Sequence, residues 1–359
     1  MSKKPKIRVA VTGLNAVDSP GPGVAVIRGV RECADYEAEI IGLSYEALEP
    51  GIYMEGMADR TYQIPYPSAG SEALLNRLYY IHEKEQIDVL IPNFDAELPN
   101  FMRLVPRLHA MGIKTFLPTA EQFDAREKVN LAKFCQKHNM LAPRDKVLYN
   151  LGELQKVAAD FGYPIVVKGK FYEATVCHTA EQAVKAYHKY ESKWGLPIIV
   201  QEFITGTEIN VAALGDGEGN CISAVPMRKL FITDKGKAWA GVTLDDPGLV
   251  KLAQQFIEAT KWRGGFELEI MRTNDGKPFI MEINPRFPAW IYLTVGAGQN
   301  QPASLVKLAL GQKVVPFTKY EVGKVFLRYS WDMIMDIQRF QHFSAFGETG
   351  TPTGIAGQP

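Results

Sequence analysis

The sequence predicts a parallel α/β domain followed by α+β segments, and three observations lead to this fold class. Short β-rich runs alternate with helical segments over roughly the first third of the 359-residue chain. Two buried strands, each preceded by a helix, follow between residues 119 and 202. A hairpin that alternates apolar and acidic residues then occupies residues 264–288. Alternating strands and helices are typical of a parallel sheet, whereas hairpins build antiparallel sheets.

The composition is that of an ordinary globular protein, with 46% hydrophobic and 22% charged residues. Lys plus Arg equals Asp plus Glu at 40 each, so the overall charge indicates neither a nucleic-acid nor a membrane partner. The four cysteines lie far apart without a CxxC spacing, which favours reduced thiols over a zinc site or disulfides. The first residues lead directly into a strand without a signal-peptide apolar region, so we expect a soluble cytoplasmic protein.

In the first third, strands are expected at 7–12, 39–43 and 89–92, and helices at 24–33 and 71–85. The loop 13–23, which is rich in Gly and Pro, suggests a dinucleotide site and an NAD-dependent dehydrogenase when taken alone. It lacks a clean GxGxxG and a well-placed acidic residue after it, and a tight strand-to-helix turn explains its glycines equally well.

The middle of the chain places two lysines beside predicted elements. A helix is expected at 120–139 with Lys128 inside it, and a buried apolar strand at 165–167 leads directly to Lys168. A lysine at the end of a buried strand suits a phosphate oxygen, although a lone one is more often a solvated charge. A second buried strand, 197–201, leads into the segment Glu202-Phe203-Ile204-Thr205-Gly206-Thr207-Glu208.

The hairpin consists of two alternating strands around the turn Asn274-Asp275-Gly276. The two-residue period of a strand puts Glu267 and Glu269 on one face of the first strand. It likewise puts Glu282, Asn284 and Arg286 on one face of the second strand. An ordinary solvated face is one interpretation of this pattern.

A magnesium site is the alternative interpretation. Mg²⁺ takes oxygen ligands, usually one or two carboxylates together with nucleotide phosphates. Glu282 and Asn284 on one strand, with Glu267 or Glu269 on the other, would supply such oxygens. Arg286 would add positive charge for a phosphate or a carboxylate.

The order of these features resembles the ATP-grasp ligases, especially the branch with the carbamoyl-phosphate synthase large chain, biotin carboxylase and the pyrrolysine-biosynthesis ligase. The strongest motifs are YPIVVK at 163–168, IVQEFITGTE at 199–208 and FIMEINPR at 279–286. The resemblance extends to about Ala309. It implies the ATP-grasp fold, in which two α+β subdomains clasp ATP. The implied domains are an N-terminal α/β domain at 1–118, subdomain A at 119–202, subdomain B at 203–330 and a C-terminal extension at 331–359.

The resemblance also implies roles for individual residues. The ATP phosphates would be contacted by Lys128 and Lys168. The adenine would be faced by Glu202 and the backbone of Phe203 and Ile204, and the ribose hydroxyls by Glu208. The Mg²⁺ ligands would be Glu269, Glu282 and Asn284, with Glu267 as the competing choice for the first of them. The catalytic residues would be Lys168 and Arg286, of which Arg286 would stabilise the acyl phosphate or its attack.

Two features leave alternatives open. Lys168 is followed by a segment with a single glycine, Gly169, where many ATP-grasp proteins have a glycine-rich flap. The basic segment 228–240 is the best substitute, although it is equally consistent with a solvated hairpin turn. Near the substrate, Trp290 and Tyr292 suit either an acceptor pocket or the core. Asp95 and Glu97 suit either an ammonium group or the start of the next helix.

The expected function is therefore an ATP-dependent carboxylate-amine ligase that acts through an acyl phosphate, on an amino acid or small peptide, with ATP and Mg²⁺ as cofactors. The expected partners are a small-molecule carboxylate and an amine, and a homodimer is left open. A bicarbonate-activating enzyme similar to a carboxylase is one alternative. A non-catalytic ATP-binding or regulatory protein is another.

Overall fold

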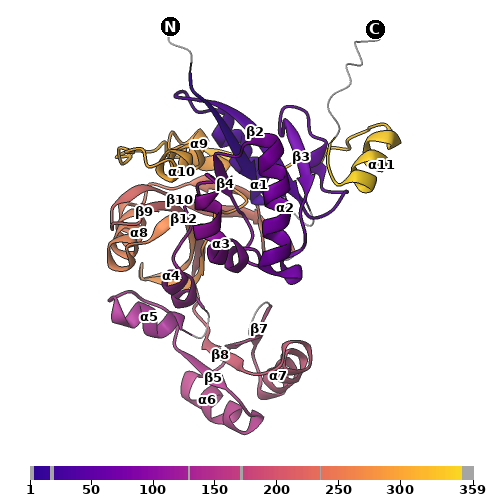
Figure 1. Ribbon diagram of the computed structural model, residues 1–359. Coiled ribbons are helices and arrows are strands. Elements are labelled where there is room, and N and C mark those ends of the chain that lie inside the picture. Colours follow the sequence, from indigo (N-terminus) through magenta and orange to yellow (C-terminus); the bar gives the residue numbers. More distant parts are fainter. Residues whose placement is uncertain (1–3, 17–19, 128–129, 170–172, 235, 350–359) are drawn as a thin grey trace. The chain divides into compact units, whose positions relative to one another are not determined.

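The computed structural model describes residues 4–16, 20–127, 130–169, 173–234 and 236–349 (Figure 1). Its contacts divide the chain into two units. Unit 1 comprises residues 1–120, 212–267 and 284–359, and unit 2 comprises residues 121–211 and 268–283. The division into four domains expected from the sequence stays a prediction.

Unit 1 begins with a four-stranded parallel sheet in the order β3-β2-β1-β4. This confirms the parallel α/β domain predicted for the first third. The sequence analysis missed β3, which has only four residues, and α3, which carries Pro106, a residue that usually ends helices. The elements are β1 (Lys6–Val11), α1 (Pro22–Arg31), β2 (Glu37–Ser44), β3 (Arg60–Gln63), α2 (Gly70–Glu85), β4 (Val89–Ile91) and α3 (Leu98–Ala110).

A larger sheet runs in the order β13-β12-β9-β10-β11-β14. β11 pairs antiparallel with both β10 and β14. The sequence of residues 322–329 also predicts a final strand, and the structure has the shorter strand β14 there. The strands are β9 (Thr207–Asp216), β10 (Cys221–Ile232), β11 (Ala238–Thr243), β12 (Arg263–Arg272), β13 (Pro278–Asn284) and β14 (Val325–Leu327). The helices of this region are α8 (Pro247–Thr260), α9 (Tyr292–Gly296) and α10 (Gln301–Ala309).

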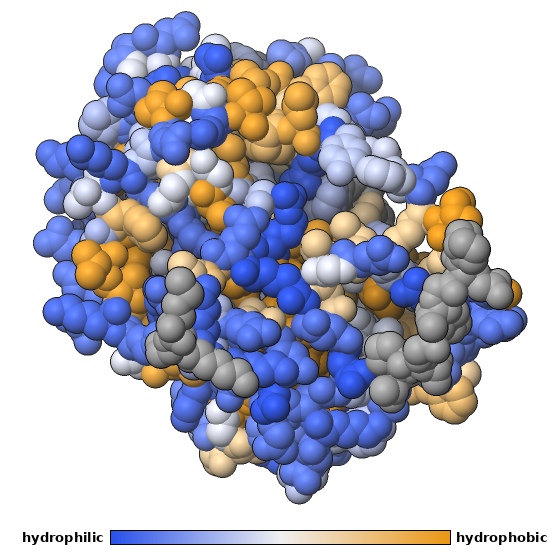
Figure 2. All heavy atoms as spheres, turned by 90° about the horizontal axis from the view of Figure 1, so that it is seen from above, coloured by the Kyte–Doolittle hydropathy of each residue, from blue (hydrophilic) through white to orange (hydrophobic). Residues whose placement is uncertain are grey.

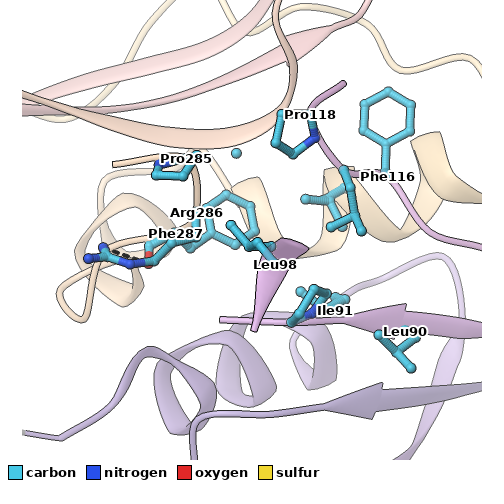
Figure 3. A pocket seen from close by; sticks show the side chains of 12 residues that line it. Leu90, Ile91, Leu98, Phe116, Pro118, Pro285, Arg286 and Phe287 are labelled. Atoms are coloured by element: carbon cyan, nitrogen blue, oxygen red, sulfur yellow. Dashed lines mark hydrogen bonds between the residues drawn. The ribbon is translucent and has the colours of Figure 1, made fainter. Parts of the chain in front are cut away.

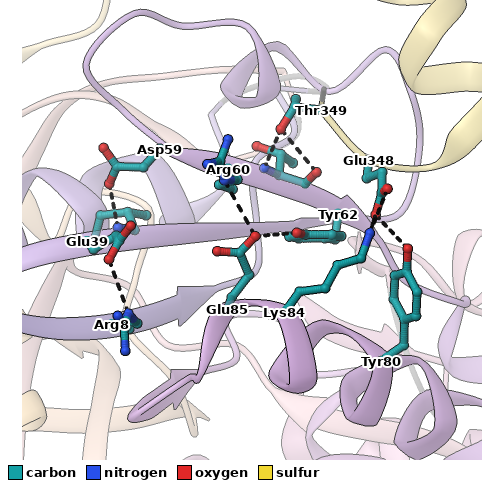
Figure 4. A network of polar contacts seen from close by, with 12 residues as sticks. Arg8, Glu39, Asp59, Arg60, Tyr62, Tyr80, Lys84, Glu85, Glu348 and Thr349 are labelled. Carbon is teal, nitrogen blue, oxygen red and sulfur yellow. Dashed lines mark hydrogen bonds and ion pairs between the residues drawn. The ribbon is translucent and has the colours of Figure 1, made fainter. Parts of the chain in front are cut away.

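The C-terminal part of unit 1 contains α11 (Ile337–Phe346) and a short segment bound to β3. The backbone N–H of Gln63 donates to the carbonyl of Gly347 at 2.8 Å, and that of Thr349 donates to Thr61 at 2.9 Å. Figure 4 shows Glu348 next to the side-chain ends of Lys84 and Tyr80, which both lie on α2. The many Gly, Thr and Pro residues of 347–359 predict a loose segment, and this prediction is wrong for residues 347–349. Residues 350–359 lie outside the described part.

Unit 2 contains an antiparallel sheet in the order β5-β8-β6-β7. Its strands are β5 (Asp145–Leu148), β6 (Ile165–Lys168), β7 (Ala174–Cys177) and β8 (Ile198–Glu202), and its helices are α4 (Ala120–Ala125), α5 (Leu131–Lys137), α6 (Leu154–Phe161) and α7 (Ala180–Trp194). The helix predicted at 120–139 is two helices. The N–H of Glu127 donates to Asp124, three residues back, and this tighter turn ends α4.

The cores of the units are built from the buried faces of these elements. In unit 2, Ile165 and Val167 of β6 pack with Tyr187 of α7, and all three side chains are fully buried. In unit 1, the parallel strands and α1 share a core with α10. Among the described residues, no helix has both the length and the apolar character that a membrane span requires.

Candidate active site

Side chains from the parts of β12 and β13 that belong to unit 1 form a polar cluster. In β12, Phe266 and Leu268 are fully buried, so alternation turns Glu267 to the opposite face. Asn284 is the last residue of β13. Pro285 follows it and offers no N–H to a strand ladder, so the chain leaves the sheet there and continues to Arg286.

The side chains of this cluster bond to one another. The amide Nδ2 of Asn284 donates to Oε2 of Glu267 at 3.0 Å, and the indole Nε1 of Trp290 donates to Oε1 at 2.7 Å. Nη1 of Arg286 lies 3.9 Å from Oε2 of Glu267. Nε of the same guanidinium donates to Oδ2 of Asp95 at 3.1 Å. One buried carboxylate is therefore held by three side chains, and Arg286 links it to a second carboxylate.

The cluster is rich in oxygen and slightly acidic. Glu267 and Asp95 bring two negative charges, and Arg286 brings one positive charge. Glu267 is 5% exposed and Asn284 is 7% exposed, so both sit where interactions with charge are strong. Carboxylate and amide oxygens are the ligand types that hard divalent cations prefer. The donor set therefore fits Mg²⁺.

An apolar pocket borders this cluster in unit 1. Its lining includes Ile91, Leu98, Phe116 and Phe287, and Arg286 is its charged member. Figure 3 shows the guanidinium of Arg286 extending away from the side chains of Ile91 and Leu98. The cavity has a volume of about 20 Å³, roughly the space of one water molecule, so it is too small for an organic substrate.

Glu97 lies at the start of α3, one of the two roles considered in the sequence analysis, and its carboxylate also binds the ends of neighbouring strands. It is 1% exposed and accepts hydrogen bonds from Thr12 Oγ1, from the hydroxyl of Tyr45 and from the backbone N–H groups of Asn93 (2.6 Å) and Phe94 (3.0 Å). Burial raises the pKa of Glu97, and these donors oppose the shift. Its partners come from the ends of β1, β2 and β4, so Glu97 joins the strand ends of the parallel sheet.

In unit 2, the residues predicted to contact the nucleotide occupy strand ends. Lys168 is the last residue of β6, and its charge opposes the burial that raises the pKa of Asp145. Glu202 ends β8, and its carboxylate accepts from Nε of Arg144 at 3.1 Å. Phe203 and Ile204 follow it directly, and Glu208 is the second residue of β9.

The predicted site residues are thus only partly brought together. Asn284 and Arg286 are adjacent, with Nη2 of Arg286 3.4 Å from Oδ1 of Asn284. Their carboxylate neighbour is Glu267, the alternative that the sequence left open. Glu269 and Glu282 lie two residues away along β12 and β13, within unit 2. Lys128 lies outside the described residues.

The cluster also contains residues to which the sequence analysis gave no such role. Trp290 was considered only as a pocket or core residue, and Asp95 only as an ammonium or helix partner. No sequence signal joins Asp95 to Arg286, because 191 positions separate them. Within the described ranges, no group of three or more His, Cys, Asp or Glu side chains is arranged to hold a metal ion.

Comparison with known proteins finds similarity to ATP-grasp proteins. The family model "ATP-grasp in the biosynthetic pathway with Ter operon" matches residues 196–326. D-alanine–D-alanine ligase of Cupriavidus metallidurans is 27% identical over 179 residues, which are 45% of this chain and 54% of that protein. The carbamoyl phosphate synthase large chain of Archaeoglobus fulgidus is 22% identical over 249 residues, 65% of this chain and 23% of that protein. The chain thus spans about half and about a quarter of these two relatives.

Solved structures share the fold at low identity. Biotin carboxylase from Campylobacter jejuni, solved with a nucleotide, has a TM-score of 0.69 at 18% identity and covers 89% of this chain and 74% of its own. The L-amino acid ligase from Bacillus licheniformis has a TM-score of 0.64 at 15% identity and covers 88% of this chain and 76% of its own. The fold is that of the ATP-grasp proteins, as predicted. The chain is similar to ATP-grasp proteins, and the matched proteins are named as ligases, synthases, synthetases and carboxylases.

Proposed function

We propose that this chain is an ATP-dependent ligase that joins a carboxylic acid, an amino acid or small peptide, to an amine. ATP would phosphorylate the carboxylate, and the amine would displace phosphate from the acyl phosphate, releasing ADP and phosphate. The cluster of Glu267, Asn284 and Arg286 carries this proposal, because it combines oxygen ligands with a guanidinium in a buried setting. The names of the relatives support the substrate class: two of them join amino acids.

Glu267 and Asn284 would hold Mg²⁺, with Glu282 two residues before Asn284 on the same face of β13. Glu267 is preferred over Glu269 because it bonds to Asn284 directly at 3.0 Å. When bound, Mg²⁺ neutralises phosphate charge. Trp290 donates to the other oxygen of Glu267 and so fixes the orientation of the carboxylate.

Arg286 would act on the acyl phosphate. Asp95 accepts from its Nε, which orients the planar guanidinium and sets the direction of its Nη groups. A preorganised cation lowers the barrier because it meets the developing negative charge without reorganising. Arg286 is therefore the group proposed to hold the oxygens of the transferred phosphoryl or of the tetrahedral intermediate.

Unit 2 would supply the nucleotide contacts. Lys168 would bind the ATP phosphates, together with Lys128. The carboxylate of Glu202 is engaged by Arg144, so the main chain of residues 202–204 is the part suited to face the adenine edge. Phe203 and Ile204 would pack against the ring, and Glu208 would accept from the ribose hydroxyls.

The experiment that tests the proposal is ADP release measured with ATP, Mg²⁺ and a panel of amino acids, offered singly and in pairs. Release that requires both a carboxylate and an amine, with a product of the corresponding mass, supports the ligase. Release that depends on bicarbonate instead supports the carboxylase alternative. ATP binding without turnover on any pair supports the binding protein and contradicts the proposal.

Matched variants test the residue assignments. Lys168→Met is expected to weaken ATP binding by about 10-fold or more, because a phosphate loses a direct positive partner. Lys146→Met is the control, because Lys146 is an exposed lysine on β5 of the same sheet. Equal ATP affinity in the two variants would show that Lys168 does not contact the nucleotide.

A further inference from the structure

The outer edge of the parallel sheet is covered by a segment from far along the chain. β3 is an end strand in the order β3-β2-β1-β4. The backbone N–H of Gln63 in β3 donates to the carbonyl of Gly347 at 2.8 Å, and the N–H of Thr349 donates to the carbonyl of Thr61 at 2.9 Å. Residues 347–349 therefore lie along β3 and bond to backbone groups that an edge strand would otherwise leave open.

Side chains of α2 bind the same segment. Nζ of Lys84 lies 3.0 Å from Oε1 of Glu348, and the hydroxyl of Tyr80 donates to Oε2 at 3.1 Å (Figure 4). Nη2 of Arg77 donates to the carbonyl of Gly347 at 2.7 Å. All three donors lie on α2, so the segment is attached both to a strand and to a helix of the parallel domain.

The segment continues directly from α11, which has a single buried side chain. Phe343 is 1% exposed, and its ring packs edge-on against Tyr53 with centroids 6.5 Å apart. Phe346 of the same helix is 66% exposed. Gly347 ends α11 with a φ of 64°, and its N–H donates to the carbonyl of Phe343 at 2.7 Å. A ten-residue helix is marginal without packing, so the attachment of α11 depends on Phe343.

The connection from β14 to α11 is exposed. Residues 329–336, all of which the structure describes, form neither helix nor strand. Trp331 is 81% exposed and Ile334 is 91% exposed. For comparison, Figure 2 shows that polar side chains dominate the face that it displays. Because the connection packs so little, α11 and residues 347–349 can leave the sheet edge without unfolding β14.

We propose that residues 337–349, named here the C-terminal strap, open and close while the rest of unit 1 stays folded, and that closure orders the carboxyl ends of the parallel strands. Opening breaks the backbone hydrogen bonds to β3 and removes Phe343 from the core, whereas the pairing of β3 with β2 remains. Elements with few buried contacts open at a lower free energy than the whole domain. This inference does not depend on the proposed ligase activity, because unit 1 alone carries it.

Gln63 connects the C-terminal strap to the strand ends. Its backbone N–H bonds to the strap, and its side-chain Nε2 donates to the carbonyl of Tyr45, directly after β2, at 3.0 Å. The hydroxyl of Tyr45 donates to Glu97, which also accepts from the N–H groups of Asn93 and Phe94 after β4. Ligands of open α/β sheets bind at these carboxyl ends. A ligand that orders them would favour the closed strap, and by linkage the closed strap would favour that ligand.

Hydrogen exchange of two neighbouring backbone amides in the full chain tests whether the strap opens separately. The N–H of Gln63 donates to the strap, whereas that of Ile64 donates to the carbonyl of Ser44 at 2.8 Å, on the β2 side of β3. Strap opening frees only the first amide, so Gln63 should exchange about 10-fold or more faster than Ile64 after correction for intrinsic rates. Equal corrected rates would show that the strap opens only when the sheet unfolds, and would overturn the proposal.

Two phenylalanines of α11 provide matched variants. Phe343→Ala removes the buried anchor and should accelerate exchange at Gln63 by about 10-fold or more, while Ile64 stays within about 3-fold of the wild type. Phe346→Ala is the control, because its side chain is exposed, and it should change neither rate. Acceleration of both amides by the same factor in Phe343→Ala would show that Phe343 stabilises the whole sheet and not the strap.

The link to the strand ends has a separate readout. The N–H of Phe94 donates to Glu97 at 3.0 Å, and its exchange should be about 3-fold or more faster in Phe343→Ala. Acceleration at Gln63 without any change at Phe94 would overturn the coupling. Glu348→Lys is a second variant that leaves the core intact, since it places a like charge beside Lys84, and it should accelerate the same two amides and not Ile64.

Discussion

Two buried glutamates of unit 1 show how similar burial can serve different purposes. Glu267 is 5% exposed and Glu97 is 1% exposed. The partners of Glu97 are hydroxyl and backbone donors from the ends of three parallel strands. Glu267 instead accepts from the side chains of Asn284 and Trp290, and its carboxylate lies 3.9 Å from a guanidinium nitrogen of Arg286. Backbone donors cannot move without the fold, so Glu97 suits a structural role and Glu267 a functional one.

The largest expected effect is on activity at Glu267. Glu267→Gln removes the negative charge but keeps the shape, and kcat/KM should fall about 100-fold or more, since the proposed Mg²⁺ site loses its carboxylate. The free energy of unfolding should also fall, by about 1–3 kcal/mol, because both carboxylate oxygens accept from buried donors and the amide N–H₂ of Gln must face one of them. Steady-state kinetics at several Mg²⁺ concentrations, together with urea unfolding, checks both parts. Unchanged activity would place Glu267 among structural residues beside Glu97.

At Glu97 we expect a loss of stability without a comparable loss of activity. Glu97→Gln replaces an acceptor oxygen with an amide N–H that faces existing donors, so the free energy of unfolding should fall by about 3 kcal/mol. In the fraction that remains folded, kcat/KM should stay within a few-fold of the wild type. Urea unfolding and kinetics at low temperature measure the two effects separately. A stable Glu97→Gln protein with lost activity would reverse the comparison between the two glutamates.

Glu49 is a third buried glutamate of unit 1, and it predicts how the free energy of unfolding depends on pH. Burial raises the pKa of Glu49 to about 7 from 4.5; the N–H of Tyr45 donates to this carboxyl group and opposes the shift. A raised pKa in the folded state favours the protonated form, so its contribution is complete below pH 4.5 and is lost as pH rises through 7. The wild type should thereby lose up to about 3 kcal/mol of stability across this window.

Glu49→Gln should flatten this part of the stability profile and make the protein more stable than the wild type at pH 8. Unfolding measured at half-unit pH steps provides the test, and Glu46→Gln, in the same loop, is the control. Parallel profiles for wild type and Glu49→Gln would show that Glu49 is ionised without cost in the folded protein.

Some of this architecture could be predicted from sequence and some could not. The two-residue period of strands placed Glu267 and Glu269 on one face, but it could not choose between them, because the choice depends on how β12 and β13 align across the turn. Strand alternation and turn chemistry act locally, so the parallel domain and the hairpin could be predicted. The contact between Arg286 and Asp95 joins residues 191 positions apart and requires the folded chain. The prediction of one helix at 120–139 was wrong, because the apolar periodicity of the sequence does not reveal the turn that ends α4.

The smallest expected effect concerns Trp290, which the sequence could assign only as an aromatic residue. Its indole N–H donates to Oε1 of Glu267 at 2.7 Å while its ring is 5% exposed. Trp290→Phe keeps most of the apolar contact and removes the donor, so stability should fall by about 1 kcal/mol. Because the donor only orients Glu267, kcat/KM should fall by about 10-fold or less and the Mg²⁺ requirement should rise. Titration of activity with Mg²⁺ separates the outcomes: a loss of stability without any shift in the Mg²⁺ dependence would assign Trp290 to the core alone.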